Sequence, residues 1–217
     1  MTSYFLTVVF SYSILPAAVV GFLRFNRITA VDRPFFYIVW LALINEILNL
    51  VFTAVFRTTA INCNIYVLAE AILYCLLFYR WGGLIGTRTR FRNLSVLICG
   101  FWIWDNLIVH NLRHTNSLFR IFSSFILVFL AIDQINQLIM TERSKLLKNA
   151  RFLICVGMVI FFTYRAIFEV FYLNISFSLA FYHRVDLIME YVNLFVNLIF
   201  AIAALWIPRR QKFILPS

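Results

Sequence analysis

Charged residues are scarce in this chain. Of its 217 residues only 13% are charged, whereas 63% are hydrophobic. Soluble globular domains are about a quarter charged and about half apolar, so this composition excludes that class. Disordered chains have few aromatic residues, and the aromatic share of 18% excludes them as well. The composition therefore predicts an integral membrane protein that consists almost entirely of membrane-spanning segments.

Glycine and proline are also few, with six and four copies. Transporters commonly interrupt their helices at these residues near the membrane midplane to build binding sites. The chain offers few such interruptions, and Pro16 is the main candidate for a kink. This scarcity favours a rigid bundle of straight helices.

Seven apolar runs are long enough to cross the membrane as helices, which takes roughly 20 residues for about 30 Å of hydrocarbon. The runs do not alternate apolar and polar residues as barrel strands do. We therefore predict an all-α, polytopic bundle of seven transmembrane helices, forming one transmembrane domain over residues 1–217. The predicted spans are residues 4–23, 35–56, 65–85, 94–110, 118–140, 152–173 and 185–207.

Lysine and arginine are distributed unevenly between these spans. Fourteen of the 19 fall in the segments on one side of the membrane and four on the other, while Arg165 lies inside a span. Since basic loops stay in the cytoplasm, we predict an outer N-terminus and an inner C-terminus, in the plasma membrane or a bacterial inner membrane. A basic inner rim facing anionic lipid explains the net charge of +10. The scatter of the basic residues over four short segments argues against nucleic-acid binding.

Several signatures of known chemistry are absent. No lysine lies within a predicted span, which excludes a retinal Schiff base. The four cysteines show neither metal-ligand spacing nor a disulfide framework, and the sequence has no H-E-x-x-H motif or Gly-rich phosphate loop. The three histidines, His110, His114 and His183, are predicted at the outer surface, where a solvated side chain is a more common outcome than a metal ligand.

Carboxylates inside the predicted spans are the most informative residues. Each costs about 3 kcal/mol near the middle of a membrane, so each is expected to face the bundle interior and to have a partner. The six acids are Glu46, Glu70, Asp105, Asp133, Glu169 and Glu190. Only one deep base, Arg165, is assigned to the spans, so some acids are expected to be protonated, hydrated or bound to a cation. We predict that Arg165 pairs with Glu169 on its own helix, or with Glu70 or Glu190 on a neighbouring helix.

Helical spacing gathers polar side chains on single faces. For example, Asp186, Glu190, Asn193 and Asn197 follow an i, i+4, i+7, i+11 pattern. With the predicted orientation most intramembrane polar residues lie in the outer half, where we predict one hydrated pocket for a small cation or amine-bearing ligand, with Arg165 available to an anionic group. The predicted ligand-binding residues are Glu46, Asn49, Glu70, Tyr74, Asp105, Arg165, Glu169, Glu190, Asn193 and Asn197.

A purely structural role is the alternative for these residues. Hydrogen bonds between membrane helices contribute about 0.6 kcal/mol each, and this interpretation is the stronger one for single asparagines and tyrosines. Carboxylates are an expensive way to join helices, so for them a functional role is favoured.

A short sequence pattern also occurs twice in the chain. Residues 43–50 and 187–194 share the pattern L-I-x-E-x-x-N-L, and they lie in helices predicted to run in opposite directions. Inverted repeats of this kind occur in transporters.

Three classes of function follow from these patterns. The favoured one is a sensor or accessory subunit, whose outer cavity takes a small ligand or cation and whose basic inner face meets a membrane or cytoplasmic partner protein. A small-solute or cation transporter or channel is the second. An intramembrane enzyme that uses paired carboxylates is the third.

Overall fold

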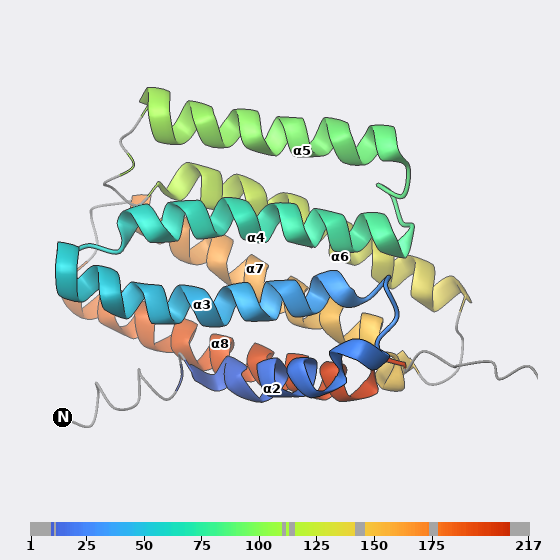
Figure 1. The fold of residues 1–217 in the computed structure, drawn as a ribbon. Helices are drawn as coiled ribbons and strands as arrows, with labels where there is room; N and C mark the ends of the chain where they lie inside the picture. Colours follow the sequence, from blue (N-terminus) through green and yellow to red (C-terminus); the bar gives the residue numbers. More distant parts are fainter. Residues whose placement is uncertain are drawn as a thin grey trace, which may run out of the picture.

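A computed structural model describes residues 10, 12–109, 112, 116–141, 146–173 and 178–208. In this part of the chain the fold is all-α, with seven α-helices and no strand (Figure 1). The helices are α2 (Leu15–Arg24), α3 (Arg33–Phe56), α4 (Ala60–Trp81), α5 (Arg88–Ile103), α6 (Ser117–Thr141), α7 (Ala150–Leu173) and α8 (Leu179–Trp206). Four short elements flank them: η1 (Tyr12–Ile14), η2 (Phe25–Arg27), the π-helical η3 (Trp104–Val109) and η4 (Leu146–Lys148).

Five of the helices, α3, α4, α6, α7 and α8, are long and apolar enough to cross a membrane. At 1.5 Å per residue, the shortest of them, α4, is about 33 Å long. Large apolar side chains on the outside of the bundle fit this setting, since Phe22, Phe129 and Met140 are each more than two-thirds exposed. A soluble protein rarely exposes such a surface. The chain therefore has the build of a helical membrane protein; that α2 and α5 also cross the membrane remains a prediction.

Each predicted span overlaps a helix, but several helix ends differ from the prediction. The α4 and α5 helices begin at Ala60 and Arg88, whereas the third and fourth spans were expected to begin at residues 65 and 94. The third predicted span was expected to end at residue 85, but α4 ends at Trp81 because Gly82 adopts a left-handed φ of 89° and its N–H bonds to the carbonyl of Phe78. The last span was expected to begin at residue 185, but α8 begins six residues earlier, where the Ser178 hydroxyl accepts a hydrogen bond from the N–H of Phe181. Residues 4–9 of the first span lie outside the described residues.

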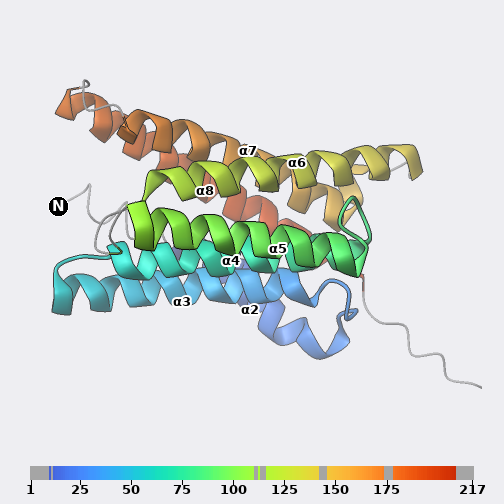
Figure 2. The same cartoon turned by 90° about the horizontal axis from the view of Figure 1, so that it is seen from above.

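Six helices form a closed ring. Neighbours pack in the order α2, α3, α4, α6, α7, α8 and back to α2, whereas α5 lies outside the ring against α4 and α6 (Figures 1 and 2). Stacking between aromatic side chains holds α5 in this place. Tyr79 of α4 stacks on Phe91 of α5, and Phe122 of α6 stacks on Phe101 of α5. Most polar side chains of α5, such as Arg88, Arg92 and Asn93, are exposed, and none of its residues lines the cavities inside the ring.

Charged groups at the predicted inner end hold helix termini and connections. The carboxylate of Asp32 accepts a hydrogen bond from Trp81 Nε1 at 2.9 Å and lies 3.4 Å from Arg151 Nε. Arg24 donates to the carbonyls of Ala204 and Ile207 and so caps the C-terminus of α8. Asp133, one of the six predicted intramembrane acids, also serves this end, because its carboxylate accepts a hydrogen bond from the N–H of Leu84, just after α4.

Candidate ligand-binding site

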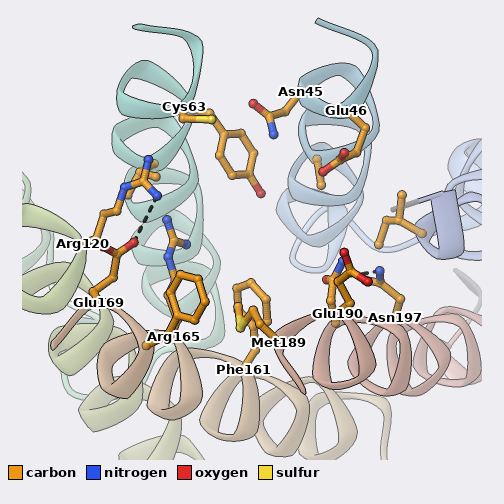
Figure 3. A pocket seen from close by; sticks show the side chains of 16 residues that line it. Asn45, Glu46, Cys63, Arg120, Phe161, Arg165, Glu169, Met189, Glu190 and Asn197 are labelled. Atoms are coloured by element: carbon orange, nitrogen blue, oxygen red, sulfur yellow. Dashed lines mark hydrogen bonds and ion pairs between the residues drawn. The ribbon is translucent and has the colours of Figure 1, made fainter. Parts of the chain in front are cut away.

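A cavity of about 270 Å³ lies inside the ring, in the predicted outer half of the bundle (Figure 3). We call it the outer cavity. It is nearly twice the size of an engineered apolar cavity of about 150 Å³ that binds benzene. Its polar lining residues come from α3, α4, α6, α7 and α8 and are Asn45, Glu46, Cys63, Tyr66, Arg120, Arg165, Glu169, Glu190, Asn193 and Asn197. A smaller cavity of about 50 Å³ shares Tyr66, Asn193 and Asn197 with it and extends to Glu70 and Tyr74.

A buried ion pair joins α7 to α4 at the base of the outer cavity. Arg165 Nη1 lies 2.6 Å from Glu70 Oε2, and the two side chains are only 8% and 5% exposed. Tyr66 donates its hydroxyl to the other oxygen, Glu70 Oε1, at 2.8 Å. The prediction that Arg165 pairs with an acid is confirmed. The partner is Glu70 on a neighbouring helix, not Glu169 on the same helix, because each of these acids faces a different arginine.

The partner of Glu169 is Arg120 on α6. Arg120 Nη1 lies 3.1 Å from Glu169 Oε1, and Ser117 donates to Glu169 Oε2 at 2.6 Å. Arg120 is one of the four basic residues that were counted in the predicted outer segments, which left Arg165 as the single base inside the spans. That count is wrong, because Arg120 also lines the cavity. The spacing Ser117, Arg120, Ser124 at i, i+3, i+7 marks one face of α6 and could have placed this arginine in the interior.

The opposite wall of the outer cavity is acidic. Figure 3 shows Glu46 of α3 and Glu190 of α8 across the cavity from Arg120 and Arg165. Within the part of the chain that the structure describes, Glu190 has no hydrogen-bond or ion-pair partner. Asn197, one of its neighbours on α8, donates to the Ser13 hydroxyl at 2.8 Å. Glu190 is therefore available to a ligand.

Apolar side chains separate the two walls. Phe161 and Met189 lie between them (Figure 3), and Ile14 and Val67 add further apolar lining. The outer cavity thus has one wall with two ion-paired arginines, one wall with two glutamates, and an apolar strip between them.

Asn49 stabilises a helix contact beside the cavity. Asn62 of α4 donates one hydrogen bond to Asn45 Oδ1 at 2.9 Å and one to Asn49 Oδ1 at 2.8 Å. Asn49 itself does not line the cavity, whereas Asn45, one turn before it on α3, does. For Asn49 the arrangement matches the structural alternative, a hydrogen bond between helices.

Asp105 lies away from both cavities, and its predicted place in the pocket is wrong. It belongs to η3, which continues α5 outside the ring, and it is completely buried. Its carboxylate accepts from the N–H of Phe119 at 2.8 Å. A carboxylate at this position pairs an N–H group that the first turn of α6 leaves without a helical partner. Asp105 therefore anchors the start of α6.

The remaining predicted residues converge. Six line the outer cavity: Glu46, Arg165, Glu169, Glu190, Asn193 and Asn197. Glu70 and Tyr74 line the smaller cavity next to it, where the Tyr74 ring also packs edge-on against Phe162 at 5.4 Å. Four polar lining residues were not predicted from the sequence: Asn45, Cys63, Tyr66 and Arg120.

Apolar side chains close the interior toward the predicted inner end. About one to two turns further along the helices, the polar residues give way to Ile38, Leu77, Met158 and Phe200, all of them buried. Phe200 packs so closely on α7 that a Cβ atom on Gly157 would lie 2.7 Å from its ring. We call these four side chains the apolar floor. Two of them, Ile38 and Phe200, also line the smaller cavity and so bound it on this side.

Compared with known proteins, this chain matches no protein-family model, no curated protein and no solved structure. The chemistry of the site therefore has to be inferred from its own residues. Within the described ranges no group of three His, Cys, Asp or Glu side chains could hold a metal ion. Of the predicted surface histidines, His183 is exposed, and His110 and His114 lie outside the described residues.

Proposed function

We propose that this chain is a multi-pass sensor or accessory subunit of the plasma membrane or bacterial inner membrane, whose outer cavity binds a small cation or amine-bearing ligand. The observation that carries the proposal is the charge of the cavity lining. Arg120 and Arg165 supply two positive charges, while Glu46, Glu70, Glu169 and Glu190 supply four negative ones. With a formal charge of −2 in a low-dielectric setting, the site favours a cation over an anion.

The apolar floor supports binding more than conduction. A solute that crossed the bundle would have to displace the packed side chains between the outer cavity and the predicted inner end. The five helices that line the cavity with polar residues, α3, α4, α6, α7 and α8, are continuous α-helices. The π-helical segment η3 follows α5, outside the ring. Broken helices at the binding site, which are typical of transporters, are absent from this described part of the ring.

A cytoplasmic or membrane partner is part of the proposal. The inner connections that the structure describes, such as residues 25–32 and 82–87, are short, and arginines lie in them or close to their ends: Arg24, Arg27, Arg33, Arg80 and Arg88. Segments of this length carry no enzymatic domain, so a signal from the cavity would pass to another protein at the basic inner face.

Transport is the second candidate, and one observation favours it. Both glutamates of the repeated L-I-x-E-x-x-N-L pattern, Glu46 and Glu190, line the outer cavity from different helices. Inverted repeats place their corresponding residues in this way around a transport site. An enzyme gains less support, because Glu70 and Glu169 are each held by an arginine.

Thermal unfolding of the purified protein tests the proposal. We expect one or more members of a panel of inorganic cations and small primary amines to raise the Tm, and Glu190→Gln to abolish that rise. Asp186→Asn is the matched control, since Asp186 lies one turn away on α8 and accepts a hydrogen bond from Tyr172 without lining the cavity. A panel without effect, or an equal rise in Glu190→Gln, contradicts the proposal. Solute uptake into proteoliposomes would instead favour transport.

A further inference from the structure

The two facing walls of the outer cavity differ in charge. This difference indicates a more specific class of ligand than a simple amine. Arg120 and Arg165 stand on one wall, and Glu46 and Glu190 stand on the other (Figure 3). A ligand that carries only an ammonium group would use the acidic wall and leave the arginine wall facing water or apolar atoms. Resting on the proposed function, we infer that the ligand is a small zwitterion, with an ammonium group toward Glu46 and Glu190 and a carboxylate toward the arginines.

The arginine wall retains hydrogen-bond donors beyond its ion pairs. Arg165 is 7% exposed and lines the cavity, yet the contact with Glu70 uses only its Nη1 atom. A guanidinium carries five N–H donors in a fixed fork. Arg120 likewise uses Nη1 for Glu169, and its Nε and Nη2 atoms are buried without a hydrogen-bond partner among the described residues.

A carboxylate is the group that these donors fit best. The two oxygens of a carboxylate accept parallel hydrogen bonds from the edge of a guanidinium, and such charge-assisted pairs are stronger than neutral ones. A small shift of the Arg120 side chain would expose its Nε and Nη2 edge to a ligand, while Arg165 already faces the cavity. The Nε and Nη2 donors of Arg120 would then gain a hydrogen-bond partner. Binding would thereby remove the free-energy cost of burying these donors unpaired.

The size and the middle of the cavity limit what joins the two charged groups. The strip between the walls, with Phe161 and Met189, is apolar, so it suits a short chain of methylene groups. The volume of about 270 Å³ holds a molecule of about the size of an amino acid. A compound with the form of an amino acid, H₃N⁺–(CH₂)n–COO⁻ or a branched equivalent, satisfies both walls and the strip.

Isothermal titration of the full-length protein in detergent tests this inference with matched compounds. The probes are ω-amino acids with one to five methylene groups, and alkylamines and alkyl carboxylates of the same lengths. Since a hydrogen bond to a charged group adds about 1.5 to 3 kcal/mol, we expect the best ω-amino acid to bind about 10- to 100-fold more tightly than its alkylamine. An alkylamine that binds equally well overturns the zwitterion while the proposed function stands. If neither amines nor amino acids bind, the proposed function fails as well.

Substitutions locate the carboxylate within the cavity. Arg165→Lys keeps the charge but removes the fork, so it should reduce the preference for the amino acid over the alkylamine to less than about threefold. Arg151→Lys is the matched control, because Arg151 is an ion-paired arginine at the opposite end of the bundle. Glu190→Gln should weaken both compounds alike. An unchanged preference in Arg165→Lys contradicts the assignment; if that variant does not fold, the comparison of compounds on the unaltered protein still decides.

Discussion

The two halves of this bundle use the same kind of ion pair for different purposes. In the predicted outer half, Arg165 and Glu70 meet at 2.6 Å beside a cavity, and both side chains are at least nine-tenths buried. In the predicted inner half, Arg151 and Asp32 meet at 3.4 Å beside a loop; the carboxylate is only 4% exposed, but the arginine side chain is 35% exposed. The burial of the arginine, not the residue type, therefore separates the pair that borders the outer cavity from the one that holds a helix end.

The polar and apolar residues follow the same division. The outer half collects asparagines, tyrosines and carboxylates on the inner faces of the ring, whereas the inner half fills the corresponding positions with side chains of the apolar floor. Charged side chains of the inner half lie at the rim of the bundle. There Arg24 caps α8, and Asp133 binds the connection after α4. A polar chamber above a packed base supports the ligand-binding role proposed above.

Removing the deep arginine should have the largest effect. Arg165→Ala leaves the Glu70 carboxylate buried without its cation, which typically costs about 3 to 5 kcal/mol. Denaturant unfolding in detergent should show this loss. The double variant Arg165→Gln/Glu70→Gln removes both charges and should recover much of it. If Arg165→Ala unfolds like the unaltered protein, the pair is in open water and the outer half is not the buried setting described here.

A clash in the apolar floor should have the next largest effect. The Cβ atom of Gly157→Ala would lie 2.7 Å from the ring of Phe200, and overpacking of this kind costs about 1 to 3 kcal/mol. Gly100→Ala on α5 is the matched control, because no atom lies within 4 Å of its Cβ position and alanine favours the helix. Equal melting temperatures for the two variants would mean that the floor is loosely packed.

Removing the carboxylate of Asp105, which anchors the start of α6, should reduce the stability less than these two changes. Asp105→Ala removes the acceptor for the Phe119 N–H, a change that costs about 1 kcal/mol at helix N-termini. Because Asp105 lies outside both cavities, cation or amine stabilisation of the remaining folded protein should be unchanged. A variant of normal stability that has lost ligand stabilisation would place Asp105 in the site after all.

The rim pair should contribute least. Arg151→Ala removes a half-exposed partner of Asp32, which keeps its hydrogen bonds from Trp81 and Thr29. Asp32 is buried, but these two donors remain and the Arg151 side chain reaches water, so the loss should resemble that of a surface ion pair, which contributes about 0 to 1 kcal/mol and is screened by salt. The melting temperature should therefore fall slightly at low salt and less at high salt. A loss as large as that of Arg165→Ala would remove the distinction between the two halves.

Sequence reasoning predicted the all-α class and the approximate helix positions, because apolar runs of membrane-spanning length identify helices directly. It also predicted that the intramembrane acids would avoid the lipid, since a lone carboxylate there is too costly. It did not predict which helix faces meet. The mistake at Asp105 arose because the position of α5 outside the ring depends on aromatic stacking with Tyr79 and Phe122, which no local pattern specifies. Choosing Glu70 over Glu169 for Arg165 required the position of Arg120, which lies 45 residues away along the chain.

The native thiol of Cys63 tests the central claim most directly, because it lines the outer cavity. Cys75 and Cys155 are completely buried, and Cys99 lies on α5, so replacing these three by alanine leaves Cys63 as the single reporter. In intact cells, membrane-impermeant thiosulfonates should label Cys63 from outside. A trimethylammonium reagent should react faster than a sulfonate reagent, and Glu190→Gln should reduce that preference. Labelling only after permeabilisation, or equal rates for the two reagents, would contradict an outward-facing acidic cavity.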